Sequence, residues 1–277
     1  MEDTLSRAPS RNSPPIEHWP LSEYTSQRQI EGWSVDEDNA ELNALSDEEK
    51  LKFLKYKHEH LGRDWTDFYF RKLGVPVRGR ILEQGAGIFW LSSYLASIDE
   101  VEEIVGVELS ESRIRAFRDL SLSLFEGADA SKIRYVVGDM HRLDVPDGTF
   151  DLIVCDAVLH HADNLVAVLR ESWRALKPGG WFVALREPII SPLRTKDPVF
   201  HSRYPEEGTA MYYYREGWKS AFLNAWYVNF RTTPFVEYGF VRGRKMPWLV
   251  RRLLRAVDIR RHLRYYPKLC LAGQKPL

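Results

Sequence analysis

The chain contains 277 residues, of which 44% are hydrophobic, and its 39 basic and 39 acidic side chains give a formal net charge of zero. This length fits one large α/β domain with additions, or at most two small domains, and the apolar content excludes a globally disordered chain. The charge balance does not indicate nucleic acid as a partner, and we expect none.

Cys155 and Cys270 are the only cysteines of the sequence, too few for a disulfide framework, and they indicate two reduced, buried thiols. The N-terminal residues contain charges and prolines where a signal peptide needs an apolar stretch. No apolar run of the sequence approaches the roughly 20 residues of a membrane-spanning helix. We therefore expect a soluble, cytoplasmic protein.

The N-terminal part of the chain divides into two predicted segments. Residues 1–30 mix Ser, Pro, Arg and Glu without periodicity and are expected to form a disordered tail. Residues 31–74 are expected to form a helical cap, because apolar side chains recur at helical spacing from about Ser46 to Leu73. Ser46 followed by Glu49 matches a capping box at the start of the first helix.

Strands and helices alternate from residue 75 to residue 188. Near-continuous apolar strands followed by amphipathic helices indicate a parallel sheet that is covered on both faces. The expected strands are residues 80–84, 101–109, 132–139, 150–158 and 181–188, and the expected helices are residues 88–97, 111–125 and 164–176. Together with two strands near the C-terminus, this pattern predicts an α/β fold with a Rossmann-like, mostly parallel, seven-stranded sheet.

The alternation ends after Pro188, and residues 189–277 are expected to form the substrate side of the molecule. An insertion rich in Pro and Tyr is followed by a helix, a strand, a basic helix and a last, antiparallel strand at or near the sheet edge. Residues 246–264 place apolar side chains on one helical face and arginines on another, which predicts peripheral contact with an anionic membrane or a phosphate-bearing substrate. The alternative is a helix that packs on the sheet with a solvated arginine face.

Acidic residues and glycines stand where the predicted parallel strands end: Glu83, Gly85 and Gly87, then Glu108, Asp139 and Asp156. Ligands of open parallel sheets bind beyond these carboxyl ends, where the strand order reverses. A dinucleotide fingerprint needs a third glycine where this chain has Trp90, and no Lys-Ser/Thr pair of a P-loop follows. The acids suit a cationic ligand that bears a ribose, an amino group and no phosphates, as S-adenosylmethionine does.

The stretches "LEQGAG", "VGVELS", "VVGDMHRLDVPDGTFDLIVCDAVLHHADN" and "ESWRALKPGGWFVALREP" resemble class I S-adenosylmethionine-dependent methyltransferases over residues 75–188. The resemblance implies that this segment binds the cofactor. The loop from Glu83 to Gly87 would wrap the methionine portion, Glu108 would bind the ribose, and Leu109 would pack on the adenine.

The resemblance also assigns the remaining strand ends. Asp139 and the Met140 backbone amide would contact the adenine edge, and the block around Asp156 would close the site below the sulfonium. Three positions depart from the common pattern, since Glu83 replaces Asp, Gln84 replaces a small residue, and Phe89 stands where a third loop glycine is common.

The catalytic candidates are His160 and His161, which follow the fourth core strand, where a base would face the transferred methyl group. An imidazole that titrates near neutrality suits a general base, and the alternative is that these histidines cap a helix or shape the pocket. Asp156, Asp163 and Asn164 resemble a Mg²⁺ set. A helix N-cap at 163–164 explains that pattern better, so no metal is expected.

The substrate candidates lie after the fifth core strand. Arg186 and Glu187 would orient the substrate, and the alternative is a buried ion pair. Tyr212, Tyr213 and Tyr214 would wall a pocket over the methyl donor, unless they pack the insertion onto the sheet.

With the resemblance, these features predict methyl transfer to a small molecule, most simply to a hydroxyl of a sugar or secondary metabolite. The alternatives are an N- or C-methyltransferase and a non-catalytic nucleoside-binding partner subunit.

Overall fold

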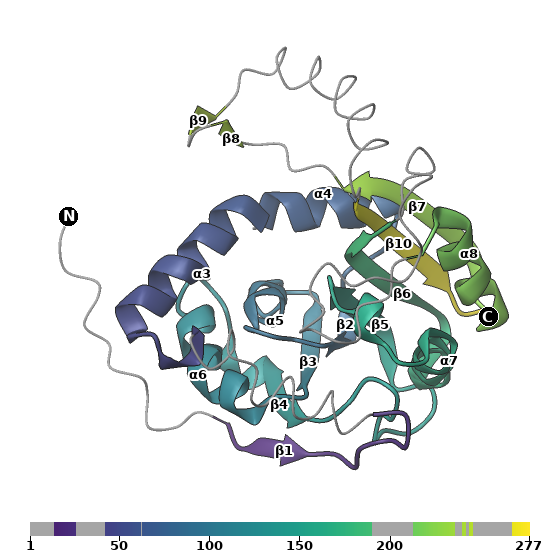
Figure 1. The fold of residues 1–277 in the computed structure, drawn as a ribbon, viewed down its shortest axis with the longest axis horizontal. Helices are drawn as coiled ribbons and strands as arrows, with labels where there is room; N and C mark the ends of the chain where they lie inside the picture. Colours follow the sequence, from purple (N-terminus) through teal and green to yellow (C-terminus); the bar gives the residue numbers. More distant parts are fainter. Residues whose placement is uncertain are drawn as a thin grey trace, which may run out of the picture.

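The computed structural model of the chain describes residues 14–25, 42–61, 63–189, 213–235, 240–241, 244–245 and 268–277. The helices are α3 (Asp47–Leu61), α4 (Arg63–Leu73), α5 (Trp90–Leu95), α6 (Glu111–Leu122), α7 (Leu165–Ala175) and α8 (Arg215–Asn224). The strands are β1 (Ile16–His18), β2 (Gly79–Gln84), β3 (Val101–Glu108), β4 (Ile133–Val137), β5 (Phe150–Asp156), β6 (Leu176–Pro188), β7 (Val228–Phe235), β8 (Phe240–Val241), β9 (Arg244–Lys245) and β10 (Lys268–Gln274). Figure 1 shows α3 to α6 on one side of the central sheet and α7 and α8 on the other.

The central sheet has eight strands in the order β1-β4-β3-β2-β5-β6-β10-β7. Every pair from β1 to β6 is parallel, and β10 is antiparallel to both β6 and β7. The predicted α/β fold with a mostly parallel sheet is therefore confirmed. The last strand is antiparallel and lies one position from the edge, as predicted, and the edge itself is β7.

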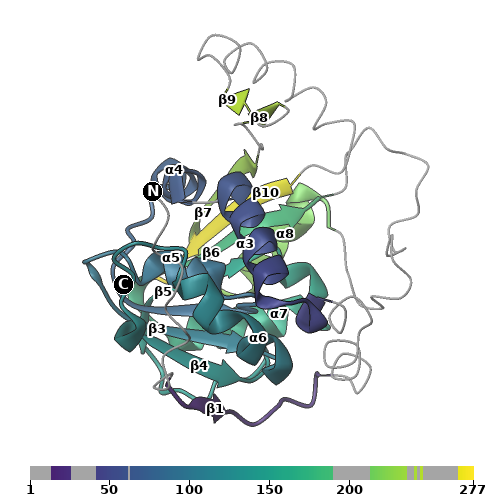
Figure 2. The same cartoon turned by 90° about the vertical axis from the view of Figure 1, so that its left-hand side faces the viewer.

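The prediction that residues 1–30 form a disordered tail is wrong for residues 14–25, and β1 is the eighth strand that the sequence did not indicate. Ile16 pairs with Tyr135 of β4, and the Glu17 carboxylate accepts from the Arg134 guanidinium at 2.6 and 2.8 Å. Trp19 is buried behind this strand. A three-residue strand between prolines has no periodicity of its own, and only its pairing with β4 stabilises it. Figure 2 shows β1 and β7 at opposite edges of the sheet.

Both faces of the sheet are covered by helices because the core strands carry apolar side chains on both faces. In β5, Leu152 and Val154 belong to the apolar cluster that includes α4 and α5, whereas Ile153 and Cys155 belong to the cluster that includes α7 and α8. Successive side chains of a strand point to opposite faces, so these two clusters are the two cores of the fold. Cys155 and Cys270 are free and buried, as predicted.

Two predicted helix starts are confirmed by their hydrogen bonds. The Ser46 backbone N–H donates to the Glu49 carboxylate at 2.9 Å, and the Glu49 N–H donates to the Ser46 hydroxyl at 3.3 Å, which is the capping box of α3. Asn164 accepts from the Ala167 N–H at 3.0 Å and caps α7. The Asn164 side chain is thus used as a cap, as the sequence favoured over a Mg²⁺ ligand.

Two predicted segments, the insertion at residues 190–212 and the basic helix at residues 246–264, lie outside the described residues. Within the described ranges, no helix has both the length and the apolar character that crossing a membrane requires.

Candidate functional site

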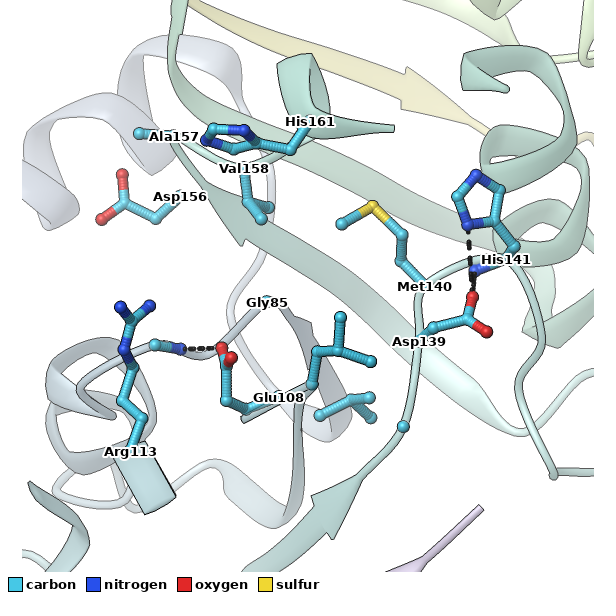
Figure 3. Close-up of a pocket in the computed structure, with 14 residues that line it drawn as sticks. Gly85, Glu108, Arg113, Asp139, Met140, His141, Asp156, Ala157, Val158 and His161 are labelled. Atoms are coloured by element: carbon cyan, nitrogen blue, oxygen red, sulfur yellow. Dashed lines mark hydrogen bonds and ion pairs between the residues drawn. The ribbon is translucent and has the colours of Figure 1, made fainter. Parts of the chain in front are cut away.

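A cleft opens at the carboxyl end of β2, between β3 and β5, where the strand order reverses. It has a volume of about 180 Å³. The predicted residues that line it are Gly85, Gly87, Glu108, Leu109, Asp139, Met140, Asp156 and His161 (Figure 3). Glu108, Asp139 and Asp156 thus share one cleft with the glycine loop, as expected, whereas Glu83 does not line it.

The glycine loop after β2 brings the main chain to the cleft floor. Gly85 has φ +65°, and a Cβ there would lie 2.3 Å from the Val158 side chain, so only glycine fits. Gly87 has φ +55°, and its N–H donates to the Glu108 carboxylate at 2.8 Å. The loop and the end of β3 are thus joined directly.

Phe89 explains why a third loop glycine is common at this position. Its φ of +60° lies in the left-handed region that favours glycine. The ring is fully buried against Tyr135, with ring centroids 5.0 Å apart, and it fills the space beside Gly106. The packing of this ring offsets the backbone strain and closes the loop from below.

Glu108 is the acid best placed for a ligand. Its two carboxylate oxygens accept from the Gly87 N–H at 2.8 Å and from the Ser110 N–H at 3.0 Å. These bonds fix the carboxylate at the cleft wall, and Figure 3 shows it beside Arg113 of α6. A carboxylate oxygen has two lone pairs, so each can accept one more hydrogen bond from a diol.

Asp156 belongs to a buried cluster with Trp90 and Arg186. Trp90 Nε1 donates to its carboxylate at 3.1 Å, and Arg186 donates through Nε at 2.6 Å and also through Nη2. Arg186 thus forms a largely buried ion pair, the alternative to substrate binding, but its partner is Asp156, and Glu187 accepts from the loop after β5 instead. Arg186 itself has φ +57°, Ala157 next to Asp156 has +54°, and Phe89 next to Trp90 has +60°, so left-handed backbone surrounds the cluster.

His160 and His161 lie next to each other in the short turn after β5, with ring centroids 4.1 Å apart, but their rings have different surroundings. His160 Nδ1 lies 2.8 Å from the carboxylate of Glu187, which is fully buried and also accepts the backbone N–H groups of Val158, Leu159 and His160. His160 therefore anchors this loop. His161 alone reaches the cleft.

Glu83 lies beneath the cleft and is not among the residues that line it. Its buried carboxylate accepts a hydrogen bond from the Ser92 hydroxyl. Burial raises the pKa of Glu83 to about 8, against the lowering effect of Ser92 and with help from the charges of Asp156 and Glu108. The side chain is consequently protonated at neutral pH, which the sequence did not predict.

The tyrosines do not line the cleft where they are described. Tyr213 packs on Trp218 of α8 with ring centroids 4.9 Å apart, and Tyr214 is exposed at the start of α8. Tyr213 thus packs on the fold, whereas Tyr214 neither lines the cleft nor packs, and the role predicted for the tyrosines toward a substrate stays a prediction. Tyr212 lies outside the described residues.

Three site residues were missed from the sequence: Trp90, Arg113 and His141. In the sequence, Trp90 marks only the position where a dinucleotide fingerprint has its third glycine. An indole that follows one strand end can donate a hydrogen bond to an acid at the end of a neighbouring strand, as Trp90 does to Asp156. Arg113 stands one helical turn after the Ser110 cap, so its direction toward Glu108 follows from the helix start. His141 had no signal, because its bridge from Asp139 to Asn164 at the start of α7 appears only in the fold.

Comparisons with known protein families and solved structures agree with this fold. Residues 82–184 match the model of the methyltransferase domain family. The chain is 29% identical over 126 residues to the ubiquinone/menaquinone biosynthesis C-methyltransferase UbiE of Ectopseudomonas mendocina, which covers 45% of this chain and 48% of that protein. The chain thus spans about half the length of the curated relatives it matches.

Two solved structures share the fold. Phosphoethanolamine N-methyltransferase 2 of Haemonchus contortus, in complex with S-adenosyl-L-methionine, aligns with a TM-score of 0.61 at 15% identity, over 91% of this chain and 60% of that one. An S-adenosylmethionine-dependent methyltransferase of Mesorhizobium loti aligns with a TM-score of 0.53 at 16% identity, over 74% and 95%.

The fold and the cleft define an α/β domain of the Rossmann-like kind. Its family match identifies residues 82–184 as a class I S-adenosylmethionine-dependent methyltransferase domain, which confirms the resemblance seen in the motifs.

The His161 imidazole is expected to stay neutral between pH 8 and pH 5. Burial, together with the charges of His160 and Arg113, lowers its pKa to about 3. The measurement is a pH titration of the ring nitrogens by NMR in protein carrying ¹⁵N-labelled histidine, with His161→Gln to assign the signal. A His161 midpoint above pH 5.5 would contradict the expectation and restore the imidazole as a strong base.

Proposed function

We propose that this protein binds S-adenosylmethionine in the cleft at the end of β2 and transfers its methyl group to a small-molecule acceptor. The observation that carries the proposal is the single cleft shared by Gly85, Glu108, Met140 and Asp156. Its acids suit a positively charged nucleoside, and its bare glycine backbone lets a ligand approach the loop.

The residues of the cleft fit the parts of this cofactor. Glu108 would accept the ribose hydroxyls, Leu109 and Met140 would hold the adenine, and the Gly85–Gly87 loop would contact the methionine portion. The bound sulfonium supplies an electrophilic methyl group. The protein's part is to hold an acceptor atom in line with that group, which accounts for most of the catalysis in such a displacement.

The acceptor would approach from the side of Asp156 that faces away from the glycine loop. A second, smaller cavity shares Asp156 with the cleft and is lined by the aromatic rings of Tyr69, Trp90 and Phe235, together with Arg186. The cavity has a volume of only about 10 Å³, so its walls would have to move apart to admit an acceptor; flat apolar rings suit a planar acceptor better than a polyol. His161, on the cofactor side, would shape the site, and its catalytic role remains a prediction.

Transfer to a hydroxyl of a sugar or secondary metabolite is the prediction from the sequence, and C-methyl transfer is the second candidate. Two observations favour carbon. The relatives with the matching domain are named C-methyltransferases, and the pKa of His161, lowered by burial to about 3, makes this imidazole a weak base for an alkyl hydroxyl. An enol or phenol supplies its own nucleophile and needs less help.

The first test is calorimetric titration with S-adenosylhomocysteine, for which we expect a single site with micromolar affinity. Transfer of the ³H-methyl group from S-adenosylmethionine to a panel of hydroquinones and a matched panel of hexopyranosides then identifies the acceptor class. Folded protein that gives no heat up to millimolar ligand would refute the proposal. Activity confined to the hexopyranosides would restore the hydroxyl assignment.

The remaining assignments are proposals of the same kind. They are a small molecule as partner, no nucleic acid, a cytoplasmic location, and division of the chain at residues 74 and 188. Contact of residues 246–264 with an anionic membrane or a phosphate-bearing substrate also remains a proposal.

A further inference from the structure

The carboxylate of Asp139 is surrounded by donors from the protein itself. The Ser22 N–H donates to Oδ2 at 2.6 Å, and the His141 N–H donates to Oδ1 at 2.6 Å. The His141 ring nitrogen Nδ1 lies 3.2 Å from Oδ1, and the Ser22 hydroxyl lies 3.5 Å from the same oxygen. A carboxylate offers about four lone-pair sites, so these donors largely fill them.

The His141 ring joins Asp139 to the start of α7. Its Nε2 accepts the backbone N–H of Asn164 at 3.2 Å and therefore carries no proton. The proton of the ring must lie on Nδ1, which makes Nδ1 a donor to Asp139. The side chains of His141 and Asp139 are only 2% and 4% exposed, so this chain of hydrogen bonds is shielded from water.

The other donors come from residues 19–25, which we call the N-terminal strap. Trp19 starts the strap, and its N–H donates to the Val137 carbonyl at 2.9 Å. The buried Trp19 side chain packs so closely on Gly138 that a Cβ at Gly138 would lie 3.3 Å from it. At the far end, the ring of Tyr24 lies 5.7 Å from the ring of His141. The strap thus covers the end of β4 on both sides of Asp139.

These bonds favour the ionised form of Asp139. Burial by itself raises the pKa of this carboxyl, but hydrogen bonds from His141, Thr25 and Ser22 outweigh it and lower the pKa to about 2. Figure 3 shows the carboxylate turned toward His141, while the Met140 side chain points into the cleft. An adenine amino group could bind Asp139 only by displacing a donor of equal quality, which would bring no net gain.

We propose that Asp139 is a positioning residue that fastens the N-terminal strap and His141 and thereby holds Met140 in the cleft, and that its carboxylate does not bind the adenine amino group. This revises what the family resemblance implied for Asp139, and it rests on the proposed function for the identity of the ligand. The adenine would then be held by the Met140 main chain and by the apolar side chains of Val107 and Leu109.

The test compares two ligands and two proteins. The ligands are S-adenosylhomocysteine and its 6-deamino analogue, in which purine replaces adenine and only the amino group is missing. The proteins are the full-length chain and Asp139→Asn, with Asp144→Asn as a matched control because Asp144 is exposed in the following loop. Hydrogen exchange of residues 14–25 is followed by mass spectrometry in all three proteins.

The ratio that decides is the dissociation constant of the 6-deamino analogue divided by that of S-adenosylhomocysteine. We expect this ratio to be the same, within twofold, in the wild type and Asp139→Asn. We also expect exchange in the strap to become about tenfold faster in Asp139→Asn alone. A ratio that falls more than twofold in Asp139→Asn, or an unchanged strap, would overturn the inference.

Two further readouts keep the result decisive. If Asp139→Asn does not fold, the wild-type ratio decides: a value above about ten indicates that a carboxylate binds the amino group, and a lower value supports the inference. If S-adenosylhomocysteine does not bind the wild type, the proposed function fails, whereas the exchange experiment still tests whether Asp139 fastens the strap.

Discussion

Replacing Glu108 with glutamine is expected to weaken S-adenosylhomocysteine binding by roughly 30- to 100-fold, or about 2–3 kcal/mol, the value of hydrogen bonds to a charged group. The carboxylate already accepts two backbone N–H groups, from Gly87 and Ser110, and each of its oxygens keeps a lone pair for a ribose hydroxyl. A glutamine has one acceptor oxygen and no charge, and its amide nitrogen would face one of the two backbone donors. The variant therefore loses ligand contacts and also loosens the glycine loop.

The matched control for this variant is Glu103→Gln. Glu103 lies on the same strand, β3, and pairs with Arg80 at 2.7 Å and Arg134 at 3.2 Å outside the cleft. Titration calorimetry at one ionic strength should give wild-type affinity for Glu103→Gln. Equal affinities of Glu108→Gln and the wild type would mean that Glu108 does not bind the ribose, and the assignment of the cleft would then have to change.

The sequence predicted the fold because its signals are local and repeated. Apolar strands followed by helix caps, such as Ser46–Glu49 and Asn164, place the parallel core without any knowledge of the third dimension. The strand ends of such a core must meet at one edge, so the cleft that joins Glu108 to Gly85 followed from the element order.

The parts that the sequence did not predict depend on distant partners. Strand β1 exists only because β4 has a free edge 117 positions later in the chain, where Glu17 finds Arg134. Ser22 reaches Asp139, also 117 positions later, for the same reason. The acids also looked alike in the sequence, yet Glu108 faces the cleft, Asp156 is paired with Arg186, and Glu83 is buried beneath them.

This difference among the acids has an electrostatic cause. Three carboxyl groups, Glu83, Glu108 and Asp156, lie near one another, and Asp156 is paired with the Arg186 guanidinium. Two neighbouring negative charges disfavour ionisation of a third, buried carboxyl group. Glu83 carries this cost, because it is the most deeply buried of the three and is hydrogen-bonded to the hydroxyl and backbone N–H of Ser92 and, within the described part of the chain, not to a cation.

Replacing Glu83 with glutamine is therefore expected to stabilise the protein relative to wild type as the pH rises. Burial raises the pKa of Glu83 to about 8 in the folded state, whereas an unfolded chain has a value near 4.3. Between these values the folded state holds a proton that the unfolded state releases, so wild-type stability falls by about 1.4 kcal/mol per pH unit. The favourable contribution of the protonated carboxyl is fully present below about pH 4.3 and is lost as the pH rises through 8.

Glutamine keeps the acceptor oxygen for Ser92 and does not titrate, so the difference in unfolding free energy between Glu83→Gln and wild type should grow by about 3 kcal/mol from pH 5 to pH 7.5. Urea denaturation followed by circular dichroism at half-unit pH steps measures this difference, and all other titrating groups cancel in it. Glu100→Gln, at an exposed position, controls for the loss of one carboxyl group. If the two curves remain parallel over this range, Glu83 is ionised in the folded protein. A positively charged group would then have to lie beside the Glu83 carboxylate to stabilise it.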